Sequence, residues 1–342
     1  MCQKRNESTL CVLCVLRGAG ARGGLVGMSC RYVLSRDAFS ATIVASVVQK
    51  SIGSEVYYSK VSRMSLSESP AYFVFDIESV ADPKLVSKVH FAGNVHESEA
   101  VKAYREELME KTKSDFIPYT FQIPISVAVA KVARDFSLLD LVVLDEPLFR
   151  PHEICSLFWR GWSHPKNNFP TLVSFNGRGF DIPMLELAAF RYGISLPRWF
   201  ALESSMYDRP RYRYNTKIHV DLHDILTNNG ATRFNGGLNL AASLLGKPGK
   251  MNTQGKMVQD MYDEGRLSEI NDYCRCDVLD TYFVFLRTMV LVGKLSLDNE
   301  QQLVKSTRDW IEQQSGMIPI YQQYLDNWGD WENPFLKTEP PT

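Results

Sequence analysis

Two acidic residues, separated by a single position, follow a short apolar segment near residue 75. Residues 71–75 have the aromatic and β-branched composition of a buried strand, and Asp76-Ile77-Glu78 comes directly after them. Alternate residues of a strand point to the same face, so both carboxylates would leave the sheet together at the end of a central strand. Two like charges side by side repel, and a hard cation with oxygen ligands removes that conflict. Taken alone, the pair is equally compatible with a solvated strand end.

A third carboxylate lies in the segment Asn176-Gly-Arg-Gly-Phe-Asp181, between an apolar strand at 171–175 and an amphipathic helix at 181–192. The two glycines allow a sharp turn and a close approach of the backbone to a ligand. Asp181 then begins the helix. Because aspartate is a favoured helix N-cap, capping is an alternative explanation for this residue.

A fourth carboxylate occurs in Tyr273-Cys-Arg-Cys-Asp277, inside the longest predicted helix, 267–292. Tyr273 and Asp277 are one turn apart and share a face with Ile270 and Val284, which predicts that this face points inward. An inward aspartate is costly unless it is paired or bound to a metal. A hydrogen-bonded core aspartate is the alternative.

The remaining pattern indicates which elements position these groups. A hairpin (123–130 and 138–144) is followed by strands alternating with helices, which predicts a mixed α/β sheet covered by helices. The polar segment 81–115 reads as an inserted loop and helix. The other predicted elements are helices at 151–162, 221–227, 238–245 and 255–265, a strand at 218–220, and one helical stretch after residue 296.

In this order, the motifs D-x-E, N-x₃-F-D and Y-x₃-D resemble the three exonuclease motifs of the DEDD nucleases. The longer text resembles one branch, the predicted bacterial 3′→5′ exonucleases related to the proofreading domain of family B DNA polymerases. The likeness runs from about Ala71 to Trp328 and includes Val220-Asp-Leu222 and Leu245-Gly-Lys-Pro-Gly-Lys250. It implies an α/β fold of the RNase H-like, DnaQ type, a mixed five-stranded sheet flanked by helices.

The resemblance also implies the chemistry. Phosphodiester bonds at the 3′ ends of single-stranded DNA or RNA would be hydrolysed, with release of nucleoside monophosphates. The implied ligands of two divalent cations, Mg²⁺ or Mn²⁺, are Asp76, Glu78, Asp181 and Asp277, with Tyr273 as the fifth catalytic residue, orienting the attacking water. Asn176 and Phe180 would line the terminal-nucleotide pocket.

Two other functions are compatible with such a fold. An RNase H-like endonuclease also uses clustered carboxylates, but Y-x₃-D on the last helix argues against it. A non-catalytic nucleic-acid-binding module would not need all four carboxylates.

One further segment has the composition of a nucleic-acid contact. Residues 209–217 interleave four cations with two tyrosines and contain no acid. Such a stretch can contact phosphates and stack unpaired bases, which makes Arg211, Tyr212 and Arg213 candidate substrate contacts. The alternative is a solvated loop anchored by its tyrosines.

Composition and net charge limit the functions and locations that the sequence allows. The 342 residues are 45% hydrophobic and carry a formal net charge of −1, so attraction to nucleic acid must come from a local patch or from metal ions. No apolar run approaches the roughly 18 residues of a membrane span. Seven cysteines without a disulfide framework suggest reduced thiols and a cytoplasmic location. The resemblance implies that this cytoplasm is bacterial.

The chain divides into three predicted parts. Residues 1–65 are expected to be a poorly structured extension or the product of a mis-assigned start. Ser8–Arg36 contains four arginines and no acid, so organelle targeting by residues 1–36 is an open alternative. Residues 66–330 are expected to form the exonuclease domain, and residues 331–342 a flexible tail.

Overall fold

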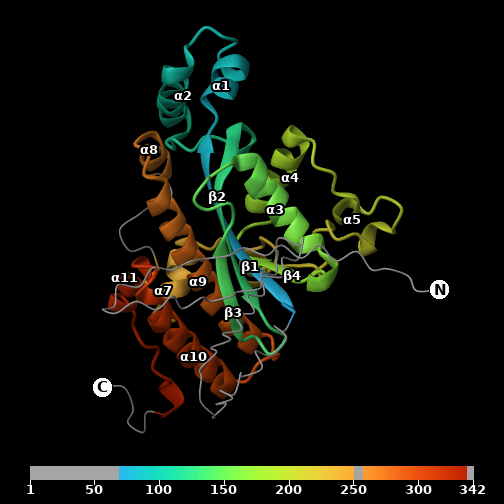
Figure 1. The fold of residues 1–342 in the computed structure, drawn as a ribbon, viewed down its shortest axis with the longest axis vertical. Helices are drawn as coiled ribbons and strands as arrows, with labels where there is room; N and C mark the ends of the chain where they lie inside the picture. Colours follow the sequence, from blue (N-terminus) through green and yellow to red (C-terminus); the bar gives the residue numbers. More distant parts are fainter. Residues whose placement is uncertain (1–68, 250–256, 337–342) are drawn as a thin grey trace, which may run out of the picture. The chain divides into compact units, whose positions relative to one another are not determined.

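Five strands form one mixed sheet in the computed structural model of the protein, which describes residues 69–249 and 257–336 (Figure 1). The sheet order is β3-β2-β1-β4-β5. The first three strands are antiparallel neighbours, whereas β4 and β5 run parallel to β1, which confirms the predicted mixed sheet. The strands are β1 (Tyr72–Ala81), β2 (Gln122–Val132), β3 (Leu138–Val143), β4 (Thr171–Ser174) and β5 (His219–Asp221).

The central strand β1 is longer than predicted. It pairs with β4 only over Tyr72–Val74, but its pairing with β2 continues to Ala81, with a register shift between Glu78 and Ser79. Asp76 and Glu78 therefore lie within the strand, and the expectation that they follow its end was wrong. The reason is that the partner strand, which the sequence of β1 does not reveal, extends the ladder past the acidic pair.

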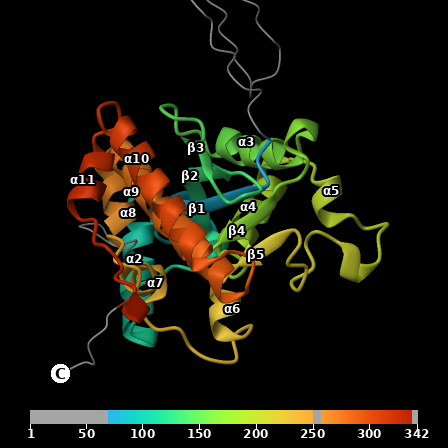
Figure 2. The ribbon, with the colours of Figure 1, turned by 90° about the horizontal axis from the view of Figure 1, so that it is seen from below.

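Helices cover both faces of the sheet (Figures 1 and 2). Phe75 on one face of β1 packs in a core with residues of α3 (Pro151–Ser163) and α4 (Asp181–Tyr192). Val74 on the opposite face packs in a second core with residues of α9 (Leu267–Leu291). The even-numbered positions of β1, which include both acidic residues, thus face the long helix.

The other elements lie around these layers and, for α1 and α2, at one end of the sheet (Figure 1). The predicted helix in the insertion is confirmed as α2, whereas α5 was not predicted and two helices stand where one was expected after residue 296. The remaining helices are α1 (Pro83–Leu85), a π-helical turn (Val86–His90), α2 (Glu97–Thr112), α5 (Pro197–Phe200), α6 (Leu222–Thr227), α7 (Gly237–Ser243), α8 (Val258–Asp263), α10 (Leu297–Ser315) and α11 (Ile320–Asp326). The 3₁₀ turns lie at Tyr119–Phe121, Pro165–Asn167, Met206–Asp208 and Pro334–Leu336.

Some predictions concern residues outside the described ranges. They are the extension 1–65, the first two residues of the helix expected at 255–265, and positions 337–342 of the tail. Within the ranges that are described, no helix is both long enough and apolar enough to cross a membrane.

Candidate active site

Three of the four predicted carboxylates meet between β1 and α9. Asp76, Glu78 and Asp277 each place one carboxylate oxygen so that all three oxygens lie within 4.8 Å of one another. Strand alternation brings the first two to one face, and α9 packs across that face with Asp277 turned toward them. Glu78 and Asp277 are each only 8% exposed. Oxygen ligands gathered at this spacing are the donor set that a hard divalent cation prefers.

Tyr273 lies at the same site, one helical turn before Asp277. Burial raises the pKa of its phenol, and the negative charges of Asp277, Glu78 and Asp76 raise it further, as does a hydrogen bond with Asp277. The phenol therefore keeps its proton at neutral pH. A protonated tyrosine beside the carboxylates can orient a water molecule by hydrogen bonding but cannot serve as its base.

Asp181 does not belong to this three-carboxylate group. It is the first residue of α4 and is buried, with 5% of its surface exposed. Burial, together with the nearby charge of Asp221, raises the pKa of its carboxyl group to about 8. A buried carboxyl group with another acid beside it is a place where a cation would favour the charged form.

The backbone before Asp181 comes very close to its side chain. A Cβ on Gly177 would stand 2.7 Å from a carboxylate oxygen of Asp181 and 2.3 Å from the Ser174 hydroxyl oxygen. The sharp turn itself is made at Asn176, whose φ is +64°. Gly177 is thus needed for the close approach and Asn176 for the turn, whereas the sequence argument had assigned both roles to the glycines.

Asp221 holds this loop in place. One of its carboxylate oxygens accepts hydrogen bonds from the backbone N–H groups of Asn176 (2.9 Å) and His223 (3.0 Å), and the other accepts from that of Arg178 (2.9 Å). The residue therefore caps α6 and also fixes the β4–α4 loop. The contact with the loop is not readable from the sequence, since an Asp at the end of a short strand does not reveal which loop lies beside it.

Arg178, which the sequence reasoning did not single out, ties the same loop to β5 and α6. Its guanidinium donates to the Asp224 carboxylate (2.9 Å) and to the backbone carbonyl of His219 (3.0 Å). Between β4 and β5, the Ser174 hydroxyl lies 2.7 Å from Nε2 of His219. Burial lowers the pKa of His219 to about 3, so this imidazole is neutral. The loop that carries Asp181 thus rests on a fixed polar scaffold.

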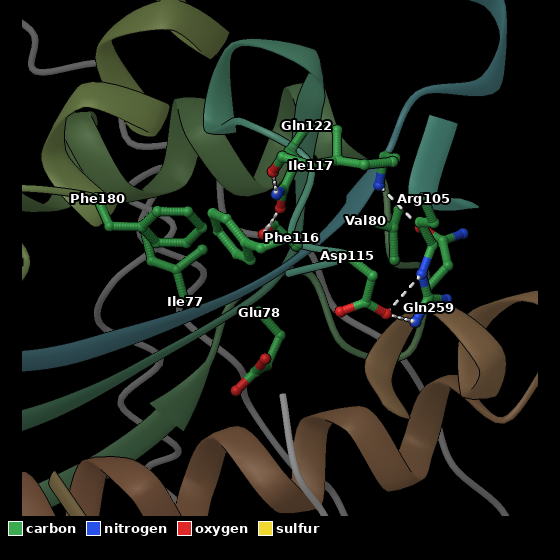
Figure 3. Close-up of a pocket in the computed structure, with 12 residues that line it drawn as sticks. Ile77, Glu78, Val80, Arg105, Asp115, Phe116, Ile117, Gln122, Phe180 and Gln259 are labelled. Carbon is green, nitrogen blue, oxygen red and sulfur yellow. Dashed lines mark hydrogen bonds and ion pairs between the residues drawn. The ribbon is translucent and has the colours of Figure 1, made fainter. Parts of the chain in front are cut away.

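A cavity of about 190 Å³ adjoins the carboxylates, and Glu78 is one of its lining residues (Figure 3). Phe180 and Asn176 were both predicted to line the terminal-nucleotide pocket. Phe180 lines this cavity, whereas Asn176 is exposed and does not line it. The opposite wall comes from the segment between β1 and β2, through Arg105, Asp115 and Phe116.

A family model described as a predicted 3′-5′ exonuclease related to the exonuclease domain of PolB matches residues 114–328. The chain belongs to this family. The match includes Asp181, Tyr273 and Asp277 but begins after Asp76 and Glu78. No curated protein matches the chain.

Membership in this predicted exonuclease family agrees with the five-stranded RNase H-like sheet flanked by helices. Asp76 and Glu78 precede the matched range. In the fold, however, each has a carboxylate oxygen within 4.8 Å of one from Asp277, which lies inside that range.

The basic and aromatic segment expected to contact substrate lies between α5 and β5 in this predicted exonuclease. Arg211 forms a two-pronged ion pair with Glu186 of α4 (2.7 and 2.8 Å). The Tyr212 ring packs against Tyr214, and the Arg213 guanidinium lies 5.1 Å from the Tyr214 ring centre. None of Arg211, Tyr212 and Arg213 lines the cavity beside Glu78. Arg211 therefore braces the loop against α4, while Arg213 stays exposed on its surface.

Proposed function

We propose that this protein is a metal-dependent 3′→5′ exonuclease that removes nucleoside monophosphates from the 3′ ends of single-stranded DNA or RNA. One observation carries the proposal: Asp76, Glu78 and Asp277 converge within 4.8 Å, with Tyr273 beside them and an open cavity next to Glu78. The family to which the chain belongs supports the direction of attack.

The donor atoms fit Mg²⁺ or Mn²⁺, because every one of them is a carboxylate oxygen. Asp76, Glu78 and Asp277 would hold one ion. Asp76 and Asp181 would serve a second, with Asp181 acting directly or through water. A pair of such ions supplies an activated water and stabilises the departing 3′ oxygen.

The protein side chains position the reactants around these ions. Tyr273 orients the attacking water by hydrogen bonding through its phenolic oxygen. Asp221 keeps the β4–α4 loop rigid, so that Asp181 and Phe180 hold fixed positions on the side of the site opposite α9. Phe180 lines the space that would receive the terminal nucleotide. Arg213 and Tyr212 are proposed to contact the strand farther from its end.

The decisive experiment follows the digestion of 5′-labelled single-stranded DNA and RNA in Mg²⁺, in Mn²⁺ and in EDTA. The proposal expects a ladder that shortens from the 3′ end, with the metal required. Asp277→Asn should abolish digestion. Asp309→Asn, which removes the same charge from an exposed position on α10, should leave it unchanged.

Two other outcomes refute the proposal in favour of the alternatives. Cleavage of a circular single strand would indicate an RNase H-like endonuclease, because a circle has no 3′ end. Binding of the labelled strands without any metal-dependent digestion would indicate a non-catalytic nucleic-acid-binding module.

A further inference from the structure

The segment between β1 and β2 folds as a small unit at the end of the sheet (Figure 1). Its helices enclose their own apolar core, built around Val86, Ala100, Tyr104 and Ile117. The His90 ring stacks on Tyr104 with 3.7 Å between the ring centres and also pairs with Glu107 (2.9 Å). The segment is therefore a packed element rather than a loose connection, although its sequence reads as polar.

Ion pairs fasten this unit to elements of both helical layers. Asp82 at its start pairs with Arg191 of α4 (2.6 Å). Arg105 of α2 pairs with Asp115 (2.7 Å) and reaches Asp260 of α8 (3.4 Å). These contacts fix the position of the residue that follows Asp115, which is Phe116.

Phe116 projects toward the site. Its side chain is 58% exposed, yet it lines the cavity that Glu78 also lines, and its ring centre lies 5.7 Å from that of Phe180 (Figure 3). What distinguishes Phe116 from other exposed rings is its place inside the cavity beside Glu78, where a bound ligand can reach it. The two rings are too close together for a base to enter between them, so the open face of Phe116 is the surface that a ligand would contact.

The polar groups of the cavity wall already bind one another. Asp115 accepts two hydrogen bonds from Arg105. Gln122 accepts from the Ser79 hydroxyl, and Gln259 accepts from the backbone N–H of Ala81. Groups engaged in this way are poorly placed to read the edge of a base, whereas a phenylalanine ring offers stacking, which every base accepts equally.

The volume of the cavity limits the size of the group that it can hold. Its volume of about 190 Å³ is below the roughly 300–1,000 Å³ of pockets that enclose a drug-sized ligand. One base fits such a space better than a whole nucleotide or the blunt end of a duplex.

We propose that the β1–β2 segment, 82–121, is a substrate-binding element, and that Phe116 stacks on the base of the 3′-terminal nucleotide without regard to its identity. This inference rests on the proposed exonuclease function and assigns to the segment a role in binding the 3′ end of the nucleic acid.

The test compares kcat/KM for two single strands that differ only in the last nucleotide, one normal and one abasic. Base–aromatic stacking contributes about 1–3 kcal/mol, so Phe116→Ala should lower kcat/KM on the normal strand about 5- to 150-fold. On the abasic strand the variant should equal the wild type, because no base is present to stack. The four terminal bases should suffer similar losses, and Phe116→Tyr should restore activity. Phe190→Ala removes a ring that is 85% exposed on α4 and should change nothing.

The outcomes separate the two proposals. An active wild type whose Phe116→Ala variant is unimpaired, or equally impaired on both strands, refutes the stacking role and leaves the exonuclease function standing. A loss confined to one base identity refutes the indifference to sequence. A wild type that digests no strand in either metal refutes the exonuclease function, and this inference with it.

Discussion

Gly177→Ala tests whether the close approach of the β4–α4 loop to Asp181 matters for function. The new Cβ would stand 2.3 Å from the Ser174 hydroxyl oxygen and 2.7 Å from an Asp181 carboxylate oxygen. Ser174 is fully buried and is held by His219, so it cannot move aside cheaply. Restoring ordinary contacts of about 3.4 Å therefore requires residue 177 to move away from Ser174 by about 1.1 Å and the Asp181 carboxylate to shift by about 0.7 Å.

The consequences can be estimated. Overpacking costs about 1–3 kcal/mol, and the alanine recovers about 0.4–1 kcal/mol by restricting the unfolded chain. The φ of Gly177 is not positive, so no backbone strain adds to this cost. We expect the free energy of unfolding to fall by about 1–2 kcal/mol, as measured by urea titration. Displacement of a catalytic group by about 1 Å costs on the order of 10²-fold in rate, so metal-dependent digestion should fall by tens-fold or more.

Gly179→Ala is the matched control. The nearest atom to a Cβ there would be Oδ1 of Asn176, at 3.2 Å, and that exposed side chain can rotate away, while the backbone oxygen of Asn176 at 3.6 Å makes an ordinary contact. Activity should stay close to wild type, and stability within about 0.5 kcal/mol. A Gly177→Ala protein that is folded and fully active would refute the reasoning, as would equal losses in the two variants.

Three further predictions concern other parts of the structure. Asp221→Ala removes three hydrogen bonds from backbone N–H groups and should destabilise the protein by about 2–4 kcal/mol in urea titration, with a large loss of activity; an unchanged midpoint would contradict this. Burial raises the pKa of Asp280 to about 8, so the wild type should lose stability as the pH rises from about 4 to about 8, and Asp280→Asn should lose less, because only Asp181 and the other buried acids then contribute, in melting curves across that range. Mn²⁺ at about 100 times its Kd should add about 2.7 kcal/mol of stability to the wild type, and Asp277→Asn should lose that gain in the same thermal scans.

The convergence of Asp76, Glu78 and Asp277 was predictable from two periodicities, which give the inward faces, together with the resemblance to the DEDD motifs, which implied that the two faces meet. Residues i and i+2 of a strand share a face, and the inward face of the last helix is marked by its apolar residues. The mixed sheet was predictable for the same reason, since a hairpin followed by alternating strands and helices restricts the topology. The faces of the strand and helix and the topology of the sheet could thus be inferred without the contacts between distant segments.

What could not be predicted depended on such contacts. The end of β1 is set by the length of β2, and the ion pair of Arg211 depends on Glu186, which is 25 positions away. The second role of Asp221 depends on the loop that packs against it. Phe116 was missed because it follows a charged helix and carries no motif, so only its place beside Glu78 reveals it.

The separation of the site residues along the chain bears on how the protein is made. Asp76 and Asp277 are about two hundred positions apart, and they meet only when α9 lies across β1. At about 5–20 residues per second, a ribosome adds Asp277 about 10–40 s after Asp76. Until then the nascent chain carries two acidic residues of the group without the third. A chain that stalls before α9 therefore lacks a complete carboxylate group, and the group can form only after α9 has been synthesised and has packed on β1.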